Sequence, residues 1–405
     1  MNTAWSLLCW IPLMAMVYSY VLFPLLLRAL VALRLPEIKD AEPSERELPM
    51  VQIFMAVYNE EQVLAQKLES VFASHYPPEK IQILVGSDAS SDQTDHILEQ
   101  FQPAHPNLRW QRFSSRTGKP GIINQLVAAH GRQGAIYILT DANVFFHPDM
   151  LRHLAGSFRD PAVALAGANV QNLVERNREI AGQEKFYIQR ENRIKQAEGA
   201  LWGTMMGAFG GCYALRASSY RPVPSRFIAD DFFLCMETIR QGGKAILQAR
   251  ALCFEDLPDS VAVEFRRKRR IGAGNYQNLW NYKKLLFLFF QPAGFCFWSH
   301  KVIRWLGPFL MLLSWAAAAL LAHPLNPSGP WNIYTCYLLF QVILFLLVAT
   351  DELLRRLGLQ TGPLRLLTYF YKMNLALFAG FILWVRGIRS NQWTPTERQI
   401  KHTTP

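Results

Sequence analysis

Polar side chains follow three apolar runs in the first half of this sequence, where together they could bind a ligand. They are Tyr58, Asn59, Glu60, Asp88, Asp141 and Asn143. Each one could instead only cap the helix that comes next, because Asp and Asn are common at helix N-termini. Their occurrence after three successive runs favours the other interpretation, a shared site for an anionic ligand.

The three apolar runs have the composition of strands that are buried on both faces of a parallel sheet. They are Val51–Val57, Ile81–Val85 and Ile136–Leu139. Between them, apolar residues spaced by three and four predict helices over Glu60–Ser74, Asp92–Phe101 and Gly118–His130. This alternation predicts an α/β domain with its ligand site at the carboxyl ends of the strands, where the polar residues lie.

Other parts of the 405-residue chain are apolar enough to cross a bilayer, which takes about 20 residues. Three segments carry no charged residue: Trp5–Leu27, Trp305–Ala322 and Trp331–Thr350. The first lacks the basic start and the cleavage site of a secretory signal, so we expect a retained anchor. Leu366–Val385 has the length of a span but includes Lys372 and Asn374, so it either spans or lies in the membrane interface.

The charge and the cysteine content of the chain limit the kinds of partner and cofactor that we expect. The net charge of +11 at pH 7 arises mainly from basic residues that flank the apolar segments, such as Arg28, Arg34, Arg266–Arg270, Arg355 and Arg356. This is the positive-inside pattern, so we expect no nucleic-acid partner, an N-terminus outside the cell and residues 51–256 in the cytoplasm. The six cysteines form no C-x-x-C pair, which argues against a disulfide framework and a cysteine metal site.

Six motifs in a fixed order give the chain a family resemblance. They are MAVYNEE (55–61), VGSDASSDQTD (85–95), RTGKPGIIN (116–124), TDANVFFHPDML (140–151), GAFGGCYALR (207–216) and ADDFFLCMETIRQGG (229–243). Over roughly residues 50–275 the sequence resembles family-2 glycosyltransferases, and within them the branch of cellulose, chitin-oligosaccharide and hyaluronan synthases. The resemblance implies a Rossmann-like GT-A fold, a nucleotide-sugar donor, usually a UDP-sugar, and a divalent metal, Mg²⁺ or Mn²⁺.

The resemblance also implies roles for the polar residues after the strands. Its nucleotide contacts fall on Tyr58, Glu60 and Asp88, with Asp88 near the uracil, and its basic contact falls on Lys119. A lysine suits a diphosphate because it offers a point charge. The metal-binding D-x-D of the family corresponds to Asp141-Ala142-Asn143. An amide therefore replaces the second carboxylate, although its carbonyl oxygen can still bind Mg²⁺ or Mn²⁺.

The catalytic position of the family corresponds to Asp231, and Asp230 replaces the glutamate that precedes it in the T-E-D motif. A carboxylate there can take the proton of the acceptor hydroxyl as it attacks from the face opposite the leaving diphosphate. Both residues could instead only stabilise the N-terminus of a helix over residues 230–241 through its dipole. We expect Asp231 to be the base, with Asp230 as the second candidate.

The segment Arg267–Ile271 stands where elongating synthases of this branch carry Q-x-x-R-W. Arg270 corresponds to the arginine that serves the donor diphosphate, but the Gln and Trp are absent. Loss of the Trp, which stacks on the acceptor sugar in those synthases, argues against processive elongation. The neighbouring basic residues are expected to face phosphate or anionic lipid, which attracts each of them by about 1 kcal/mol.

These observations predict an integral protein of the cell inner or plasma membrane. Residues 1–35 are the anchor, 36–50 a linker, 51–275 a cytoplasmic GT-A domain, 276–300 an interfacial segment, 301–390 a transmembrane region and 391–405 a tail. We expect a hexosyl- or N-acetylhexosaminyltransferase that moves a sugar from a nucleotide-sugar to a glycan or lipid-linked acceptor beside membrane lipids; no oligomeric state is predicted. The alternatives are a processive polysaccharide synthase that exports its product and a non-catalytic nucleotide-binding membrane protein.

Overall fold

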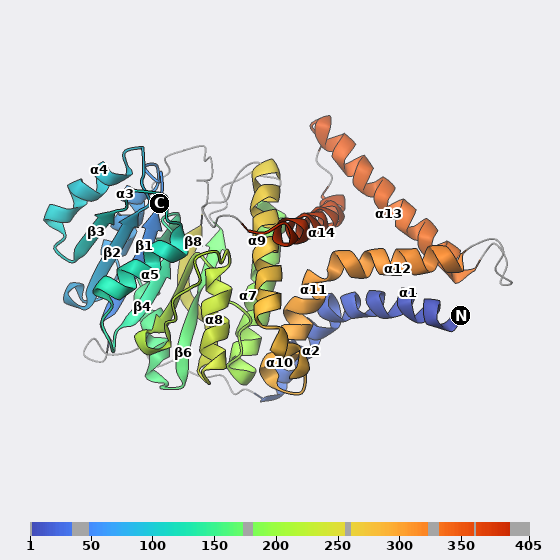
Figure 1. Ribbon diagram of the computed structural model, residues 1–405, viewed down its shortest axis with the longest axis horizontal. Coiled ribbons are helices and arrows are strands. Elements are labelled where there is room, and N and C mark those ends of the chain that lie inside the picture. The colour runs from blue at the N-terminus through green and yellow to red at the C-terminus, as the bar shows by residue number, and fades with distance from the viewer. Residues whose placement is uncertain are drawn as a thin grey trace. The chain divides into compact units, whose positions relative to one another are not determined.

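A computed structural model describes residues 2–34, 48–172, 181–255, 261–322, 332–359 and 362–388. These residues form two compact units (Figure 1). The sheet unit is built mainly from residues 27–263, and the helical unit from residues 1–26, 264–290 and 297–386. Each unit is considered by itself.

The sheet unit alternates strands and helices along most of its length. Its strands are β1 (Val51–Val57), β2 (Ile81–Ser87), β3 (Leu108–Arg112), β4 (Ile136–Thr140), β5 (Val144–Phe146), β6 (Val163–Asn172), β7 (Cys212–Arg216) and β8 (Lys244–Glu255). Its helices are α3 (Leu64–Phe72), α4 (Thr94–Phe101), α5 (Lys119–His130), α6 (Met150–Gly156), α7 (Ala181–Trp202), α8 (Asp230–Arg240) and the short α10 (Pro292–Cys296).

The eight strands form one mixed sheet in the order β3-β2-β1-β4-β7-β6-β8-β5. The first four are parallel neighbours, so the residues after β1, β2 and β4 emerge at the same edge. β7 runs antiparallel to both β4 and β6, and β5 runs antiparallel to β8. This topology confirms the α/β class and brings the polar residues after the parallel strands toward one another.

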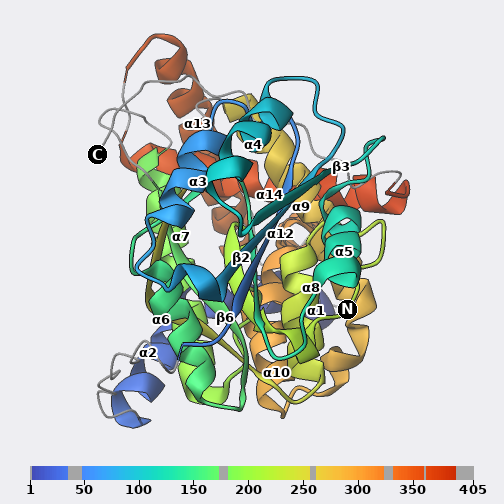
Figure 2. The same cartoon turned by 90° about the vertical axis from the view of Figure 1, so that its left-hand side faces the viewer.

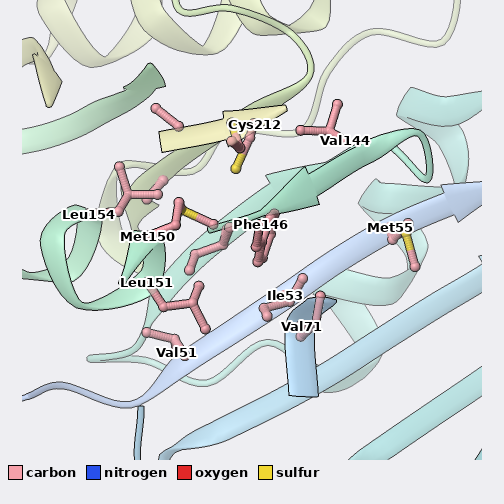
Figure 3. Packing of buried hydrophobic residues seen from close by; sticks show 14 of the residues in the cluster. Val51, Ile53, Met55, Val71, Val144, Phe146, Met150, Leu151, Leu154 and Cys212 are labelled. Atoms are coloured by element: carbon pink, nitrogen blue, oxygen red, sulfur yellow. The ribbon is translucent and has the colours of Figure 1, made fainter. Parts of the chain in front are cut away.

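Both faces of the sheet are covered by helices, with α3 and α6 on one side and α5 and α8 on the other (Figure 2). Alternate residues of β1 supply the two faces. Figure 3 shows Ile53 and Met55 of β1 in one core with Val71 of α3 and Leu154 of α6. Phe54 points the other way and packs edge-on against Tyr137 of β4, at 5.0 Å between ring centres. Burial on both faces explains why β1 is apolar except at Gln52, whose buried amide donates to Gln82 and to the His130 carbonyl.

The helical unit contains the apolar segments of the chain. Its helices include α1 (Asn2–Val17), the start of α2 (Phe23–Arg34), most of α9 (Val261–Asn281), α11 (Ile303–Trp305), α12 (Gly307–Leu321), α13 (Ile333–Arg356) and α14 (Pro363–Val385). α1 and α12 lie side by side (Figure 1), and Ser314 donates a hydrogen bond to the carbonyl of Cys9 at 2.8 Å. Two π-helical segments, Tyr18–Leu22 and Phe297–Val302, are joined by a 2.6 Å hydrogen bond from Ser19 to the carbonyl of Ser299.

Among the described residues, three helical stretches are long and apolar enough to cross a membrane: Thr3–Leu33, Ile333–Arg356 and Leu364–Val385. The expected span from Trp305 to Ala322 is different, because the helix Pro292–Trp305 bends by 64° before Gly307–Leu321. Pro308 at the start of α12 has no N–H to continue a helix from the preceding turn. The two halves count as a fourth candidate if they form one span.

The predicted boundaries agree best with the structure for strands whose residues are all buried. The predicted first strand matches β1, and β2 continues two residues further than predicted, to Ser87. α3 begins at Leu64 rather than Glu60, because the amides of Val63 and Leu64 both bond the carbonyl of Glu60 in a turn. The boundary at Asp256, most of the linker 36–50, the loop 323–330 and the tail 391–405 lie outside the described residues.

Close packing of α5 on β2 predicts a stability effect at Gly86. A Cβ added there would lie 2.2 Å from Cγ2 of Ile122, closer than any real contact. We expect Gly86→Ala to lower the free energy of unfolding by about 1–3 kcal/mol through overpacking. Thermal unfolding of the detergent-solubilised protein checks this, with Ala129→Ser on the exposed side of α5 as the control. Equal melting temperatures for the two variants would contradict the packing.

Candidate active site

Asp88 organises the loop that leads into α5. It follows β2, its side chain is fully buried, and its carboxylate accepts hydrogen bonds from Arg116 Nε at 3.0 Å and from the backbone N–H groups of Thr117 and Gly118. The Arg116 guanidinium in turn lies 3.3 Å from the centre of the Tyr58 ring. The residue after β1 and the residue after β2 are therefore joined through one cation.

The loops after β1 and β2 also bond each other directly. Asn59 and Ala89 both adopt positive φ, at 51° and 57°, which is unfavourable for residues other than glycine. The Ser91 N–H donates to Asn59 Oδ1 at 2.8 Å, and the Glu60 N–H donates to Thr94 Oγ1 at 2.8 Å. These bonds hold two strained loops together at the edge of the sheet. Backbone strain of this kind is often found in functional sites.

Lys119 lies at the centre of a cluster of carboxylates. It is the first residue of α5, and Gly118 before it has φ of 82°. Its Nζ donates to Asp141 Oδ1 at 2.7 Å and to the Gly210 carbonyl at 3.3 Å, and it lies 3.8 Å from Asp230 Oδ2. Burial opposes its charge, but the carboxylates outweigh burial and raise the pKa of Lys119. Lys119 is therefore a cation at every physiological pH.

Asp231 lies beside this cluster at the start of α8. Its Oδ1 accepts a 2.7 Å hydrogen bond from the N–H of Phe232, and a Cβ on Gly210 would lie 3.0 Å from its Oδ2. Burial and the neighbouring charge of Asp230 raise the pKa of Asp231 to about 6, although Lys119 partly offsets them. Asp231 is thus a carboxylate that gains and loses a proton near neutral pH, as a general base must.

Asp141 and Asn143 occupy a tight turn between β4 and β5. The Val144 N–H closes the turn on the carbonyl of Asp141 at 3.3 Å, and the Asn143 amide donates to Glu255 Oε1 at 3.3 Å. The Asp141 side chain is 37% exposed, so a ligand can reach it. Within the described residues, no group of three or more His, Cys, Asp or Glu side chains is placed to hold a metal ion by itself.

Of the sequence-predicted residues, the structure brings Lys119, Asp141, Asp230 and Asp231 into one cluster and places Tyr58 and Asp88 on either side of Arg116. Glu60 is buried in the neighbouring loop. Arg270 belongs to α9, in the helical unit, so its predicted contact with the diphosphate stays a prediction.

Sequence analysis missed two cations of this region, Arg116 and Lys67. Arg116 is part of a quoted motif, but its partners could not be inferred without the fold. Lys67 is fully buried under the turn of Asp141, and burial lowers its pKa to about 8. A signal for Lys67 was present, because it shares the inward face of α3 with Leu64, Leu68 and Val71, at helical spacing.

The mixed sheet thus carries a carboxylate and lysine cluster at the ends of its parallel strands. The model of the family "Glycosyl transferase family 2" matches residues 52–221, and this part of the chain is a family 2 glycosyltransferase domain. The resemblance is thereby confirmed at the level of the family over residues 52–221, which include five of the six motifs.

The relatives of the chain include enzymes of membrane lipid synthesis. The chain is 26% identical over 276 residues to beta-monoglucosyldiacylglycerol synthase of Synechocystis, covering 66% of this chain and 55% of that protein. It is 38% identical over 245 residues to the probable glycosyltransferase YdaM of Bacillus subtilis, covering 57% and 56%. The chain thus spans little more than half the length of these relatives.

One solved structure shares the fold over nearly the whole chain. The mannosyltransferase PcManGT of Pyrobaculum calidifontis, in complex with GDP-Man and Mn²⁺, has a TM-score of 0.66 and 21% identity. The alignment covers 93% of this chain and 99% of that one. This likeness confirms the predicted GT-A fold.

The charge balance around Lys119 predicts a pH-dependent stability effect. We expect Lys119→Met to lower the melting temperature more at pH 8 than at pH 5. Asp231 is ionised at pH 8 and largely protonated at pH 5, so loss of the ammonium matters more at the higher pH. Lys244→Met removes a lysine from an exposed pair with Asp160 and should have little effect at either pH. An equal drop in the melting temperature of Lys119→Met at both pH values would contradict this charge balance.

Proposed function

We propose that the protein is a membrane-bound, inverting glycosyltransferase that transfers a sugar from a UDP-sugar to a lipid acceptor at the cytoplasmic face of the membrane. The observation that carries the proposal is the contact of Lys119 with Asp141 and Asp230 beside the partly exposed Asp231. This cluster combines a cation that can bind a diphosphate with a base whose pKa lies near neutrality.

The donor would be held by residues from three strand ends. The nucleoside would be held by Tyr58 and Glu60, which follow β1, and by the Arg116 loop, which Asp88 fixes. Lys119 would bind the diphosphate as a point charge, and the N-terminus of α5 adds backbone N–H groups that favour an anion. Arg270 is proposed as a second cation for the diphosphate, as its correspondence to the family arginine implies.

Asp231 would act as the base. The acceptor hydroxyl attacks the anomeric carbon as the bond from that carbon to the diphosphate oxygen breaks, and its proton passes to a carboxylate oxygen of Asp231. Attack from the face opposite the leaving group inverts the anomeric configuration. With a pKa of about 6, the carboxylate is ionised at pH 7 yet basic enough to accept this proton.

The residues fit a divalent cation that is held jointly by protein and substrate phosphate. Asp141 offers a reachable carboxylate, and Asn143 offers an amide oxygen two residues later. Mg²⁺ sites that bind nucleotides often use only one or two protein oxygens with phosphate and water. When bound, such a cation neutralises charge on the leaving diphosphate. We propose Mg²⁺ or Mn²⁺ at this position.

The candidate membrane spans and the relatives support a lipid acceptor. Three described helical stretches are long and apolar enough to cross a membrane, and the Synechocystis relative is named as a synthase of a glucosylated diacylglycerol. The positive-inside pattern favours a cytoplasmic location for the sheet unit. We therefore propose diacylglycerol or a similar lipid hydroxyl as the acceptor.

The test uses the full chain in nanodiscs that contain diacylglycerol. UDP-glucose, UDP-galactose and UDP-N-acetylglucosamine are supplied in turn with Mg²⁺ or Mn²⁺, and UDP release and glycolipid products are measured. We expect metal-dependent release from one donor and a lipid that carries one sugar. Long polymers would indicate a processive synthase instead. No release from any donor would indicate a non-catalytic binding protein.

The assignment of the base predicts the behaviour of Asp231→Asn. Asn has the size of Asp, and its amide oxygen can still accept the hydrogen bond from the Phe232 N–H, so the fold should be retained, but Asn cannot accept the proton. We expect transfer to fall by about 10²-fold or more while UDP binding stays within twofold, because the lost interaction belongs to the transition state. UDP binding by calorimetry is the internal control. Transfer at the wild-type rate would exclude Asp231 as the base and make Asp230 the next candidate.

A further inference from the structure

Lys67 is a cation in the hydrophobic core of the sheet unit. It is fully buried on α3, on the face that also presents Leu64, Leu68 and Val71 to the sheet. Lysine is almost never fully buried unless its charge is compensated, because removing an ammonium group from water is costly. A methionine or leucine would fill such a position without that cost. The presence of a lysine therefore calls for a reason beyond stability.

The hydrogen-bond and ring partners of the Lys67 ammonium group lie on one short segment. Its Nζ donates to Thr140 Oγ1 at 3.0 Å and to the carbonyl oxygen of Val144, and it lies 3.5 Å from the centre of the Phe146 ring. Thr140 is the last residue of β4, and Val144 is the first residue of β5. One ammonium group thus fastens both ends of the turn that connects these strands.

The residues between these two ends are Asp141, Ala142 and Asn143. The turn is also fixed from its other side, because the Asp141 N–H donates to the Gly211 carbonyl at 3.0 Å and Thr140 Oγ1 lies 3.1 Å from the same oxygen. Ala142 at the middle of the turn is buried. The side chains of Asp141 and Asn143 are therefore the groups that the fastened turn presents outward, and both are partly exposed.

We propose that Lys67 is a positioning residue that holds Asp141 and Asn143 in the arrangement that binds a divalent cation together with a nucleoside diphosphate. The proposal rests on the proposed function, because it assigns Lys67 to the cation site proposed there. Lys67 touches neither the cation nor the substrate. It acts through Thr140 and Val144, which fix the backbone on both sides of the two ligands.

The test measures Mn²⁺ binding rather than turnover. Free Mn²⁺ is followed by electron paramagnetic resonance during titration of the full chain at saturating UDP, and UDP binding without metal is measured separately. We expect Lys67→Met to weaken Mn²⁺ binding by about tenfold or more and to change metal-free UDP binding by less than twofold. Val71→Ala is the matched control, because it removes core volume from the same face of α3 without touching the turn. It should leave Mn²⁺ binding unchanged.

A second variant shows whether Lys67 acts through the turn. Thr140→Val removes one of the two oxygen partners of Lys67 and keeps the shape of the side chain. It should weaken Mn²⁺ binding alone and have a smaller effect in the presence of Lys67→Met, because both changes remove the contact between Lys67 and Thr140, and only Thr140→Val also removes the bond to the Gly211 carbonyl. If Lys67→Met does not fold, Thr140→Val decides by itself, with a loss of threefold or more as support and unchanged binding as refutation.

The remaining outcomes separate this inference from the proposed function. Wild-type Mn²⁺ affinity in Lys67→Met, or an equal loss in Val71→Ala, would overturn the positioning role while leaving the proposed function intact. A wild-type protein that binds neither UDP nor Mn²⁺ would overturn the proposed function, and the positioning role with it.

Discussion

One ammonium group among three carboxylates is the interaction on which the candidate site depends. Asp141, Asp230 and Asp231 converge at the edge of the sheet, where Asp230 is buried and the other two are only partly exposed, so their negative charges repel one another. Lys119 offsets this repulsion by a direct hydrogen bond to Asp141 and a position 3.8 Å from Asp230. The offset is incomplete at Asp231, whose pKa stays raised. The repulsion that Lys119 does not offset keeps the pKa of Asp231 near neutral pH, in the range that the proposed base needs.

The sheet supplies the geometry that makes this balance possible. Parallel pairing of β1 with β2 and β4 brings their polar ends to one edge, and the antiparallel β7 beside β4 carries Gly210 and Gly211 to the same place. A side chain at Gly210 would crowd Asp231, so the absence of a Cβ lets the carboxylate lie against the backbone. Two further cations, Arg116 and Lys67, hold the loops on either side of the cluster.

The sequence predicted the parts of this structure that are encoded locally. The boundaries of β1 followed from a continuous apolar run, and the site residues followed from their places after strands and from the family motifs. The strands β3, β5, β6, β7 and β8 were not predicted. β3 is an edge strand with exposed Arg109, and the small residues of β6 carry little strand signal. The bend before α12 was also missed, since an uncharged stretch through Pro308 has the same composition as a straight span.

Two kinds of information could not be obtained from the sequence. Arg116 and Lys67 act through partners that lie far away in the chain, such as Asp88 and Thr140, so their roles depend on the pairing of strands. The pKa of Asp231 depends on burial and on the charges of Asp230 and Lys119 beside it, whose positions no motif specifies. Motifs therefore predicted residues of the candidate site, and only the fold showed how their charges lie relative to one another.

The pH dependence of sugar transfer tests this charge balance most directly. The wild-type kcat/KM should fall as the pH drops through about 6, because protonation of Asp231 removes the base. Asp230→Asn should move the midpoint of this fall to lower pH, since it removes a negative charge that raises the pKa of Asp231. A wild-type rate that stays level from pH 8 to pH 5, or a midpoint that Asp230→Asn leaves unchanged, would contradict the account.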